Sequence, residues 1–395
     1  SGRLGRSSAG RIYGGFEDRL MDKNFRSVYV HIPFCAKKCR YCAFNSYADK
    51  FPLADSYFDA VSRQISALEK DKTDTVYIGG GTPSAVDKKY IVNVLDEIYS
   101  HFDVQKNAEI TVEANPKSAS YETISAYAEK NVNRISIGAQ SFNQNELSAI
   151  GRIHTAKDVE NAVKTAHLCG IDNVNIDIMY AIPHQTRESL AETLKRAVSL
   201  DISHISLYGL AVEDGTPLAS DVENGVFVPF SDDEYAHQYE YICDFLRENG
   251  FVHYEISNFA RSENFLSRHN LKYWHGGEYY GIGAGASGYI NGERYTNEAK
   301  IEDYIASPFA KSDVEKIGKN GRMSEYMILN LRLLQSGIDE EEFREKFGID
   351  MFSVFGEKLD FHLNTTKMLE KKGKKIVLSK EAYYVCNAVM CDFLI

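Results

Sequence analysis

The sequence has no uninterrupted apolar run near the roughly 18–20 residues that a membrane-crossing helix needs, and no leader of the secretory type opens it. It also lacks an excess of positive charge, since 45 Lys and Arg against 56 Asp and Glu give a net charge of -11. This balance opposes attraction to phosphate backbones and anionic lipid headgroups. We therefore predict a cytoplasmic globular protein with no nucleic-acid partner, which would reach a membrane only peripherally and through its partners.

Cysteine is scarce and unevenly placed. There are seven cysteines, and three of them, Cys35, Cys39 and Cys42, fall within eight positions. An odd number with such a concentration favours metal ligation in a reducing compartment over a disulfide framework. The other four are scattered and are simplest to interpret as small buried apolar residues: Cys169, Cys243, Cys386 and Cys391.

Short β-branched or apolar runs alternate with amphipathic helical patterns from Ser27 onward. Repeated alternation of this kind requires parallel strands joined by right-handed crossovers, so the sequence predicts an α/β fold with a partial (β/α)6 barrel. In such barrels the chemistry lies at the carboxyl ends of the strands. The six predicted strands are residues 27–32, 75–80, 109–114, 133–138, 173–179 and 204–211, and examples of the predicted helices are 55–69, 89–101, 156–169 and 187–200.

The chain divides into three predicted parts. Residues 1–20 are rich in Gly, Ser and Arg and precede Met21, which indicates a vector remnant or disordered extension, with an organelle transit peptide as the alternative. Residues 21–306 should hold the barrel and a segment that closes one side of it. Residues 307–395 should begin with a linker to about residue 320 and continue as a small helical or winged-helix-like domain, for which the acidic charge favours a lid or packing role over DNA binding.

The motif HIPFCAKKCRYC follows the first predicted strand and spaces its thiols as C-x3-C-x2-C. A loop this short can wrap one face of a [4Fe–4S] cluster. Three ligands leave one iron open, and the methionine moiety of S-adenosylmethionine (SAM) can chelate it, so that one electron would cleave the sulfonium. Structural zinc with His31 as a fourth ligand is the alternative. Tyr41 would pack near the adenine or serve ordinary packing.

Polar and glycine residues follow the next strands. Gly80, Gly81 and Thr82 would let the backbone approach the methionine amine, or simply form a tight turn. Glu113, Gln140 and Asp177 end or occupy strands three, four and five, and should converge at the barrel mouth on ribose hydroxyls and the sulfonium. Arg152 could pair with the methionine carboxylate. Taken singly, such residues are more often satisfied buried polar residues or surface ion pairs, so the prediction depends on their joint arrangement.

Two further segments are candidate ligand-binding sites. Gly283, Gly285 and Gly288 have G-x-G-x-x-G spacing, but the preceding EYY is a poor strand and no crossover helix follows, so we reject a dinucleotide site. His269 opens HNLKYW, which holds the single tryptophan of the chain. A histidine beside two large aromatics can be an axial heme ligand, although a structural histidine is the alternative.

Together, the motifs HIPFCxxxCxYC, GGGTPS, TVEANP, GAQSF, IGRIHTA, NIDIMY, EDGTPLA, YEISNFA and RHNLKYW resemble the oxygen-independent coproporphyrinogen III oxidase-like family of the radical SAM superfamily. The resemblance spans nearly all of residues 27–395. Within that family, RHNLKYW resembles the signature of the heme chaperone branch. True decarboxylases of the family carry another cysteine two positions after the third ligand, where this chain has Phe44, and that departure counts against coproporphyrinogen dehydrogenase activity.

The resemblance implies cofactors, partners and site residues. It implies a protein that binds heme or a related tetrapyrrole and delivers it to acceptor proteins of the respiratory chain, with an electron donor for its cluster. A tetrapyrrole-modifying enzyme, either the decarboxylase or an enzyme of anaerobic heme degradation, and a zinc-stabilised barrel without redox chemistry stay open. The implied SAM contacts are Tyr29, Gly80, Gly81, Thr82, Glu113, Gln140, Arg152, Asp177 and Ala211, with His269 as the heme contact and Cys35, Cys39 and Cys42 as the cluster ligands.

Overall fold

The computed structural model describes residues 25–395, which form two compact units. The first, here called the barrel unit, comprises Ser27–Leu266 and Tyr279–Lys316. The second, here called the C-terminal unit, takes in Ser267–Glu278 and Ile317–Ile395 together with residues 25–26. The extension predicted at residues 1–20 lies outside the described residues.

All six predicted strands are present in the barrel unit and neighbour one another in chain order. The pairs from β2 to β6 are parallel, and each crossover contains helix, so the predicted α/β fold is confirmed. The strands are β1 (Phe25–Ile32), β2 (Lys72–Gly80), β3 (Asp103–Ala114), β4 (Arg134–Gln140), β5 (Asn173–Tyr180) and β6 (His204–Gly209).

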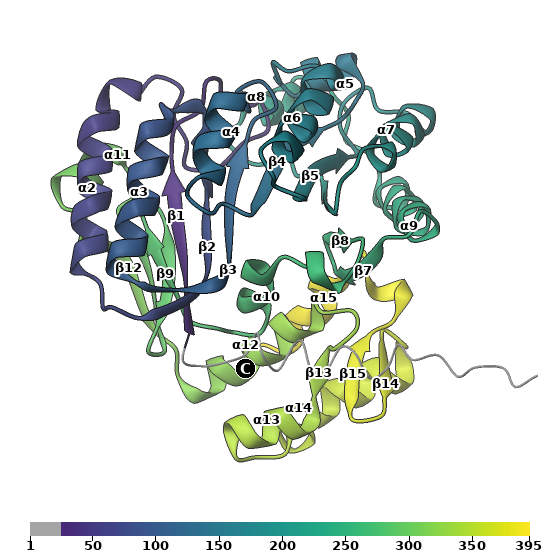
Figure 1. Ribbon diagram of the computed structural model, residues 1–395. Helices are drawn as coiled ribbons and strands as arrows, with labels where there is room; N and C mark the ends of the chain where they lie inside the picture. Colours follow the sequence, from purple (N-terminus) through teal and green to yellow (C-terminus); the bar gives the residue numbers. More distant parts are fainter. Residues whose placement is uncertain (1–24) are drawn as a thin grey trace, which may run out of the picture. The chain divides into compact units, whose positions relative to one another are not determined.

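Helices cover one face of this sheet, and α2, α3 and α4 pack side by side along its outside (Figure 1). Their positions follow from local signals. Thr155 and Thr186 each form a capping box that starts a helix, because the threonine side chain accepts a backbone N–H that the first turn would leave unpaired. The helices of this unit are α2 (Ala54–Ala67), α3 (Lys88–His101), α4 (Tyr121–Ala128), α5 (Gln144–Ala149), α6 (Ala156–Leu168), α7 (Arg187–Ser199), α8 (Pro217–Glu223), α9 (Asp232–Glu248) and α11 (Ile301–Ala306).

The sheet extends beyond the six strands on both sides and stays open. β7 (Val252–Glu255) and β8 (Asn258–Ala260) continue it antiparallel past β6. On the other side β9 (Tyr279–Ile282) pairs parallel with β1, followed by the antiparallel strands β10 (Ser287–Ile290), β11 (Glu293–Asn297) and β12 (Lys311–Lys316). The sheet therefore ends at β12 and at β7, and the barrel is incomplete, as predicted.

Two local expectations in this region are wrong. The residues around EYY were expected to make a poor strand, yet β9 forms there, because its tyrosines and isoleucine favour strands and β1 pairs with it in parallel. The linker expected at residues 307–320 contains β12, which pairs with β11. No crossover helix follows β9 within the described residues, since β10 returns antiparallel beside it.

The C-terminal unit combines helices with a small antiparallel sheet of order β13-β15-β14. Tyr326, Phe343, Phe355 and Phe393 pack edge to face through its core. No helix of the described residues is long and apolar enough to cross a membrane. The elements are α10 (Arg268–Trp274), α12 (Lys319–Leu331), β13 (Ile338–Asp339), α13 (Glu340–Phe347), α14 (Met351–Asp360), a π-helical turn (Phe361–Thr365), β14 (Leu369–Lys372), β15 (Lys375–Leu378) and α15 (Cys386–Cys391).

Candidate cluster and cofactor site

The three clustered cysteines lie on one loop between β1 and α2, residues 33–47, here called the cluster loop. Its two ends are tied together, because Cys35 N donates to Tyr47 O at 2.9 Å and Tyr47 N donates to Pro33 O at 2.7 Å. Within the loop, Cys42 N donates to Cys39 O at 3.3 Å. These bonds hold the cysteine-bearing segment at the carboxyl end of β1, where the sequence placed it.

The thiols supply soft donors in a partly buried setting. Burial raises the pKa of Cys35 and of Cys42, and Thr82 Oγ1 donates to Cys35 Sγ at 3.6 Å. Among the described residues, no three His, Cys, Asp or Glu side chains already stand in a geometry that could hold a metal ion. The three thiols fit an iron–sulfur cluster by the chemistry of their sulfur donors, and ligation would deprotonate them.

The zinc alternative would need His31 as its fourth ligand, and the hydrogen bonds of His31 oppose that role. Both ring nitrogens of His31 are engaged, Nδ1 with the Tyr29 hydroxyl at 2.9 Å and Nε2 with Asn45 O at 2.8 Å. Burial lowers the pKa of this histidine. His31 therefore serves to join β1 to the cluster loop, and a metal could reach it only by breaking one of these two bonds.

The glycines after β2 have a structural explanation of their own. Gly80 has φ +107°, and a Cβ there would lie 2.4 Å from the His31 ring. A Cβ on Gly81 would lie 2.7 Å from Ile32 O, to which Gly81 N donates at 2.8 Å. The absence of side chains at both positions is therefore required to bring the ends of β1 and β2 together, and contact of Gly80, Gly81 and Thr82 with SAM stays a prediction.

Glu113 lies at the end of β3, beside the end of β2. Tyr77 Oη donates to its Oε1 at 2.7 Å, and Gly80 N donates to its Oε2 at 3.1 Å. Burial, assisted by the charge of Asp177, raises the pKa of Glu113 to about 7 against these two bonds and the charge of Arg134. The result is a carboxyl group that titrates near neutral pH when no cofactor is present.

Gln140 and Arg152 meet at the end of β4. Gln140 has φ +63°, which a non-glycine residue rarely adopts, and such strain is frequent at functional sites. Arg152 Nη2 donates to Gly138 O at 2.5 Å, and Nη1 donates to Cys39 Sγ at 3.5 Å. The Arg152 Nε atom is buried without a hydrogen-bond partner. The structure thus brings Arg152 beside the cluster loop with unused donor capacity.

Three other residues, for which contact with SAM stays a prediction, have the following surroundings. The Tyr29 hydroxyl is bonded to His31, and burial raises the pKa of Tyr29. Ala211 is exposed in the loop that follows β6. Tyr41 packs against an apolar cluster of Ile150, Met179, Ile182, Leu210 and Leu218, and a position near the adenine stays a prediction for it.

Asp177, in the middle of β5, accepts a hydrogen bond from Asn175 Nδ2 at 2.8 Å. Burial raises the pKa of Asp177, and the charges of Arg134 and Arg152 oppose that rise. Register aligns Glu113 with Ser136, and Ser136 with Asn175, across β3, β4 and β5. Glu113 and Asp177 therefore lie on one face of the sheet, on the strands to either side of β4.

Arg134 is a residue that sequence reasoning missed. It is only 2% exposed, and its charge acts on the carboxyl groups of Glu113 and Asp177. Asn175 and His204 were missed as well. The sequence signal that could have found these residues is the alternation of polar Arg134 and Ser136 with apolar Ile135 and Ile137. In a barrel, such alternation indicates a polar interior face rather than a solvent-facing one.

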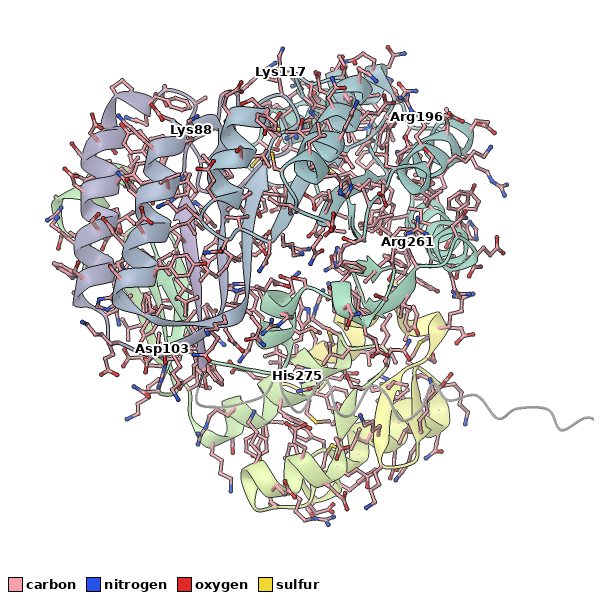
Figure 2. The ribbon with its side chains drawn as sticks, viewed as in Figure 1. Lys88, Asp103, Lys117, Arg196, Arg261 and His275 are labelled. Carbon is pink, nitrogen blue, oxygen red and sulfur yellow. The ribbon has the colours of Figure 1, made fainter. Side chains whose placement is uncertain are left out.

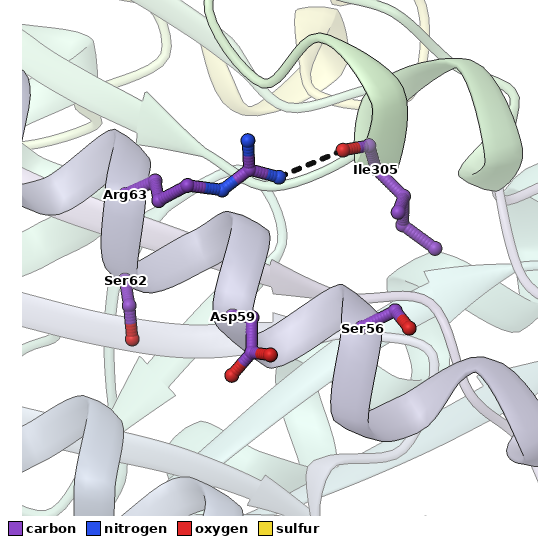
Figure 3. A pocket seen from close by; sticks show the side chains of 5 residues that line it. All are labelled: Ser56, Asp59, Ser62, Arg63 and Ile305. Atoms are coloured by element: carbon purple, nitrogen blue, oxygen red, sulfur yellow. Dashed lines mark hydrogen bonds between the residues drawn. The ribbon is translucent and has the colours of Figure 1, made fainter.

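One surface pocket is lined by none of these side chains. It is an open depression on the outer surface of α2, lined by Ser56, Asp59, Ser62 and Arg63 together with Ile305 of α11 (Figure 3). Arg63 Nη2 donates to Ile305 O at 2.8 Å and bridges the depression. It contains neither a cysteine nor a histidine, and we assign it no site.

His269 lies in the C-terminal unit, at the start of α10, and is only 1% exposed. Its Nε2 atom is 2.8 Å from the Tyr273 hydroxyl one helical turn later. Trp274 ends the helix, with the Arg332 guanidinium 4.3 Å from its ring centroid. The histidine and both aromatics of the motif therefore belong to one helix, in the same unit as α12.

Comparison with known proteins places this geometry in a family. Residues 29–197 match the model of the radical SAM superfamily. The chain is 38% identical over 371 residues to the heme chaperone HemW of Lactococcus lactis, covering 93% of this chain and 97% of that protein. This chain belongs to the HemW family. HemW of Bacillus subtilis is 33% identical over 379 residues, which cover 93% of this chain and 99% of that protein.

A solved structure agrees on the fold. The coproporphyrinogen III oxidase HemN from Escherichia coli, a radical SAM enzyme, superposes with a TM-score of 0.80 over 96% of this chain and 92% of that chain, at 20% identity. At this identity the likeness concerns the fold alone. Membership of the HemW family, within the radical SAM superfamily, implies a [4Fe–4S] cluster and SAM as cofactors. The thiol donors and the unused Arg152 donor are the features of this chain that suit those groups.

Proposed function

We propose that this protein is a heme chaperone, which binds heme and transfers it to acceptor proteins. The observation that carries the proposal is its relationship to proteins named heme chaperones over nearly its whole length. The acceptors would be proteins of the respiratory chain, and an electron donor would reduce the cluster. Phe44, in place of an additional cysteine, speaks for this function over decarboxylation.

The cluster loop would hold a [4Fe–4S] cluster through Cys35, Cys39 and Cys42. When bound, the cluster supplies the electron that can cleave SAM. The chain's own residues bind and orient the cofactor: Arg152 offers its unused donor to a carboxylate, while Glu113 and Asp177 offer acceptors to hydroxyls and to positive charge. Tyr29, Gly80, Gly81, Thr82, Gln140 and Ala211 complete the proposed SAM contacts.

Heme, as cargo, would bind at the HNLKYW helix through His269. The Nε2 atom of His269 is already 2.8 Å from the Tyr273 hydroxyl. Ligation of heme iron by that nitrogen would break this contact and move Tyr273 away. The aromatic side chains of Tyr273 and Trp274 would then offer apolar surface to the porphyrin.

The deciding experiment is a heme titration of the anaerobically reconstituted protein, followed by extraction and mass analysis of the tetrapyrrole after incubation with SAM and reductant. A chaperone returns intact heme from a saturable complex. His269→Ala should weaken the complex, and His275→Ala, which alters another buried histidine of the same unit (Figure 2), should leave it unchanged. Recovery of a decarboxylated or ring-opened product would indicate that the protein is a tetrapyrrole-modifying enzyme and not a chaperone.

A further inference from the structure

A chain of buried hydrogen bonds runs behind Asp177 through three other side chains. The Tyr254 hydroxyl is 2.9 Å from His204 Nε2, and His204 Nδ1 is 2.6 Å from Asn175 Oδ1. Asn175 Nδ2 donates to Asp177 Oδ1 at 2.8 Å. Three strands, β5, β6 and β7, therefore contribute to one connected polar path that ends on a carboxylate.

The carboxylate fixes the direction of every bond in the path. Asn175 Nδ2 donates to Asp177 Oδ1, so Asn175 Oδ1 is left as an acceptor. His204 must then carry its proton on Nδ1 to donate to that oxygen. His204 Nε2 is consequently an acceptor, and the Tyr254 hydroxyl donates to it. Burial and the charge of Arg134 hold the pKa of His204 well below its usual range, so the ring is neutral.

Additional hydrogen bonds and burial hold Asn175 and His204, in the middle of the path, in place. Asn175 Nδ2 also donates to Ser136 Oγ at 2.7 Å, and Ser206 Oγ donates to Asn175 Oδ1 at 3.2 Å. His204 is fully buried and Asn175 is 1% exposed. Strand register sets Asn175 opposite His204 and Asp177 opposite Ser206, so the backbone pairing and the side-chain bonds agree.

We propose that His204 and Asn175 are positioning residues that aim the Asp177 carboxylate at SAM. Asn175 holds the Asp177 carboxyl group through Oδ1, with Ser136 donating to the same oxygen at 3.4 Å, while His204 keeps the Asn175 amide from rotating. A side chain with two rotatable torsions is in this way restricted to one orientation before the ligand arrives, which lowers the entropic cost of binding. The inference rests on the proposed SAM contact of Asp177 and adds the residues that make that contact effective.

His204→Leu and His204→Asn form a matched pair for testing this role. Leucine and asparagine have nearly the same shape, so both variants leave a similar cavity where the ring was. Asparagine, however, retains an N–H at the position of Nδ1 and leucine does not. Calorimetric titration of SAM into the reconstituted protein should give a dissociation constant raised about tenfold in His204→Leu, as for a lost buried hydrogen bond, and raised less than about threefold in His204→Asn.

A double-mutant cycle with Asp177→Ala separates positioning from a general loss of structure. If His204 acts through Asp177, His204→Leu should have no further effect on SAM affinity once the carboxylate is gone. His253→Leu serves as control, because His253 is also buried but stacks on Phe259 of β8, and it should leave SAM affinity unchanged. Iron content and melting temperature are measured for every variant.

The outcomes are distinguishable. Weaker SAM binding in Asp177→Ala with unchanged binding in His204→Leu overturns the positioning role and leaves the Asp177 contact standing. Unchanged binding in Asp177→Ala overturns the contact itself and the positioning role with it. Additive losses in the double variant, or equal losses in His204→Leu and His204→Asn, would mean that His204 acts through the packing of the barrel and not through Asp177.

Discussion

Arg152 and Cys39 are joined across 113 residues of sequence, with Nη1 of the guanidinium 3.5 Å from the cysteine Sγ atom. The same guanidinium donates to Gly138 O at the end of β4. A single cation therefore couples the cluster loop to a neighbouring strand end, at the place where the cofactor is expected.

Removal of this cation should weaken SAM binding. Arg152→Met should raise the SAM dissociation constant roughly 10- to 100-fold, the range for a lost charge-assisted hydrogen bond in a buried site. Arg152→Lys should recover part of the loss, because it keeps the charge without the planar fork. Arg196→Met, at a solvent-accessible ion pair with Glu160 on the surface of α7 (Figure 2), is the control. Wild-type affinity in Arg152→Met would contradict the assignment.

Glu113 should make the stability of the cofactor-free protein depend on pH. Its pKa of about 7 in the folded state exceeds its ordinary value of 4.5, so the folded state holds a proton that the unfolded state has released. The free energy of unfolding should therefore fall as pH rises from about 4.5 to 7, by at most about 3 kcal/mol. Glu113→Gln should flatten this fall. Urea unfolding at pH 5 and pH 8 measures it, and parallel pH profiles for the two proteins would refute it.

Gly80 should tolerate no side chain. Gly80→Ala combines a φ of +107° with a Cβ 2.4 Å from the His31 ring, and should cost about 3 kcal/mol or more. Gly170→Ala isolates the backbone contribution, because Gly170 has φ +81° but no atom within 4 Å of the added Cβ; about 1 kcal/mol is expected there. Thermal unfolding compares the two, and equal losses would show that the contact with His31 is irrelevant.

Tyr273 should restrain His269. Tyr273→Phe removes the hydroxyl that lies 2.8 Å from His269 Nε2. In this variant, iron binding by Nε2 would no longer require the loss of that hydrogen bond. Heme affinity should rise about fivefold, which corresponds to roughly 1 kcal/mol for one neutral hydrogen bond. Heme titration followed by absorbance measures the change. A large loss of affinity instead would indicate that the hydroxyl itself supports the bound heme.

Asp221 should help to retain the cluster. Arg40 of the cluster loop forms an ion pair with Asp221 on α8, and Leu218 N of the same helix donates to Arg40 O at 3.0 Å. Asp221→Asn should accelerate iron loss to a chelator about two- to fivefold, a modest effect because the pair is partly exposed. The exposed pair Asp244–Arg247 supplies the control variant Asp244→Asn. An unchanged rate of iron loss would show that α8 does not stabilise the loop.

The strand pattern and the cysteine spacing could be interpreted directly from the sequence. β1 to β6 begin and end within a few residues of their predicted bounds, apart from the longer amino-terminal part of β3, because alternation with helices is a local property. β9 and β12 could not be foreseen in this way. β9 is only four residues long, although its tyrosines favour strands, and β12 is exposed throughout, so pairing with β1 and β11 decides both.

The sequence by itself determined the identity of the chemical groups: three thiols on one loop, carboxyl groups at strand ends, and a histidine before two aromatics. Only the tertiary structure decided how they are used. It assigned His31 to Tyr29 and Asn45, Gly80 to close packing, and Arg134, Asn175 and His204 to the polar interior. The physical reason is that local patterns follow from neighbours along the chain, whereas strand register and burial, which set hydrogen-bond partners and pKa values, join residues that are distant in sequence.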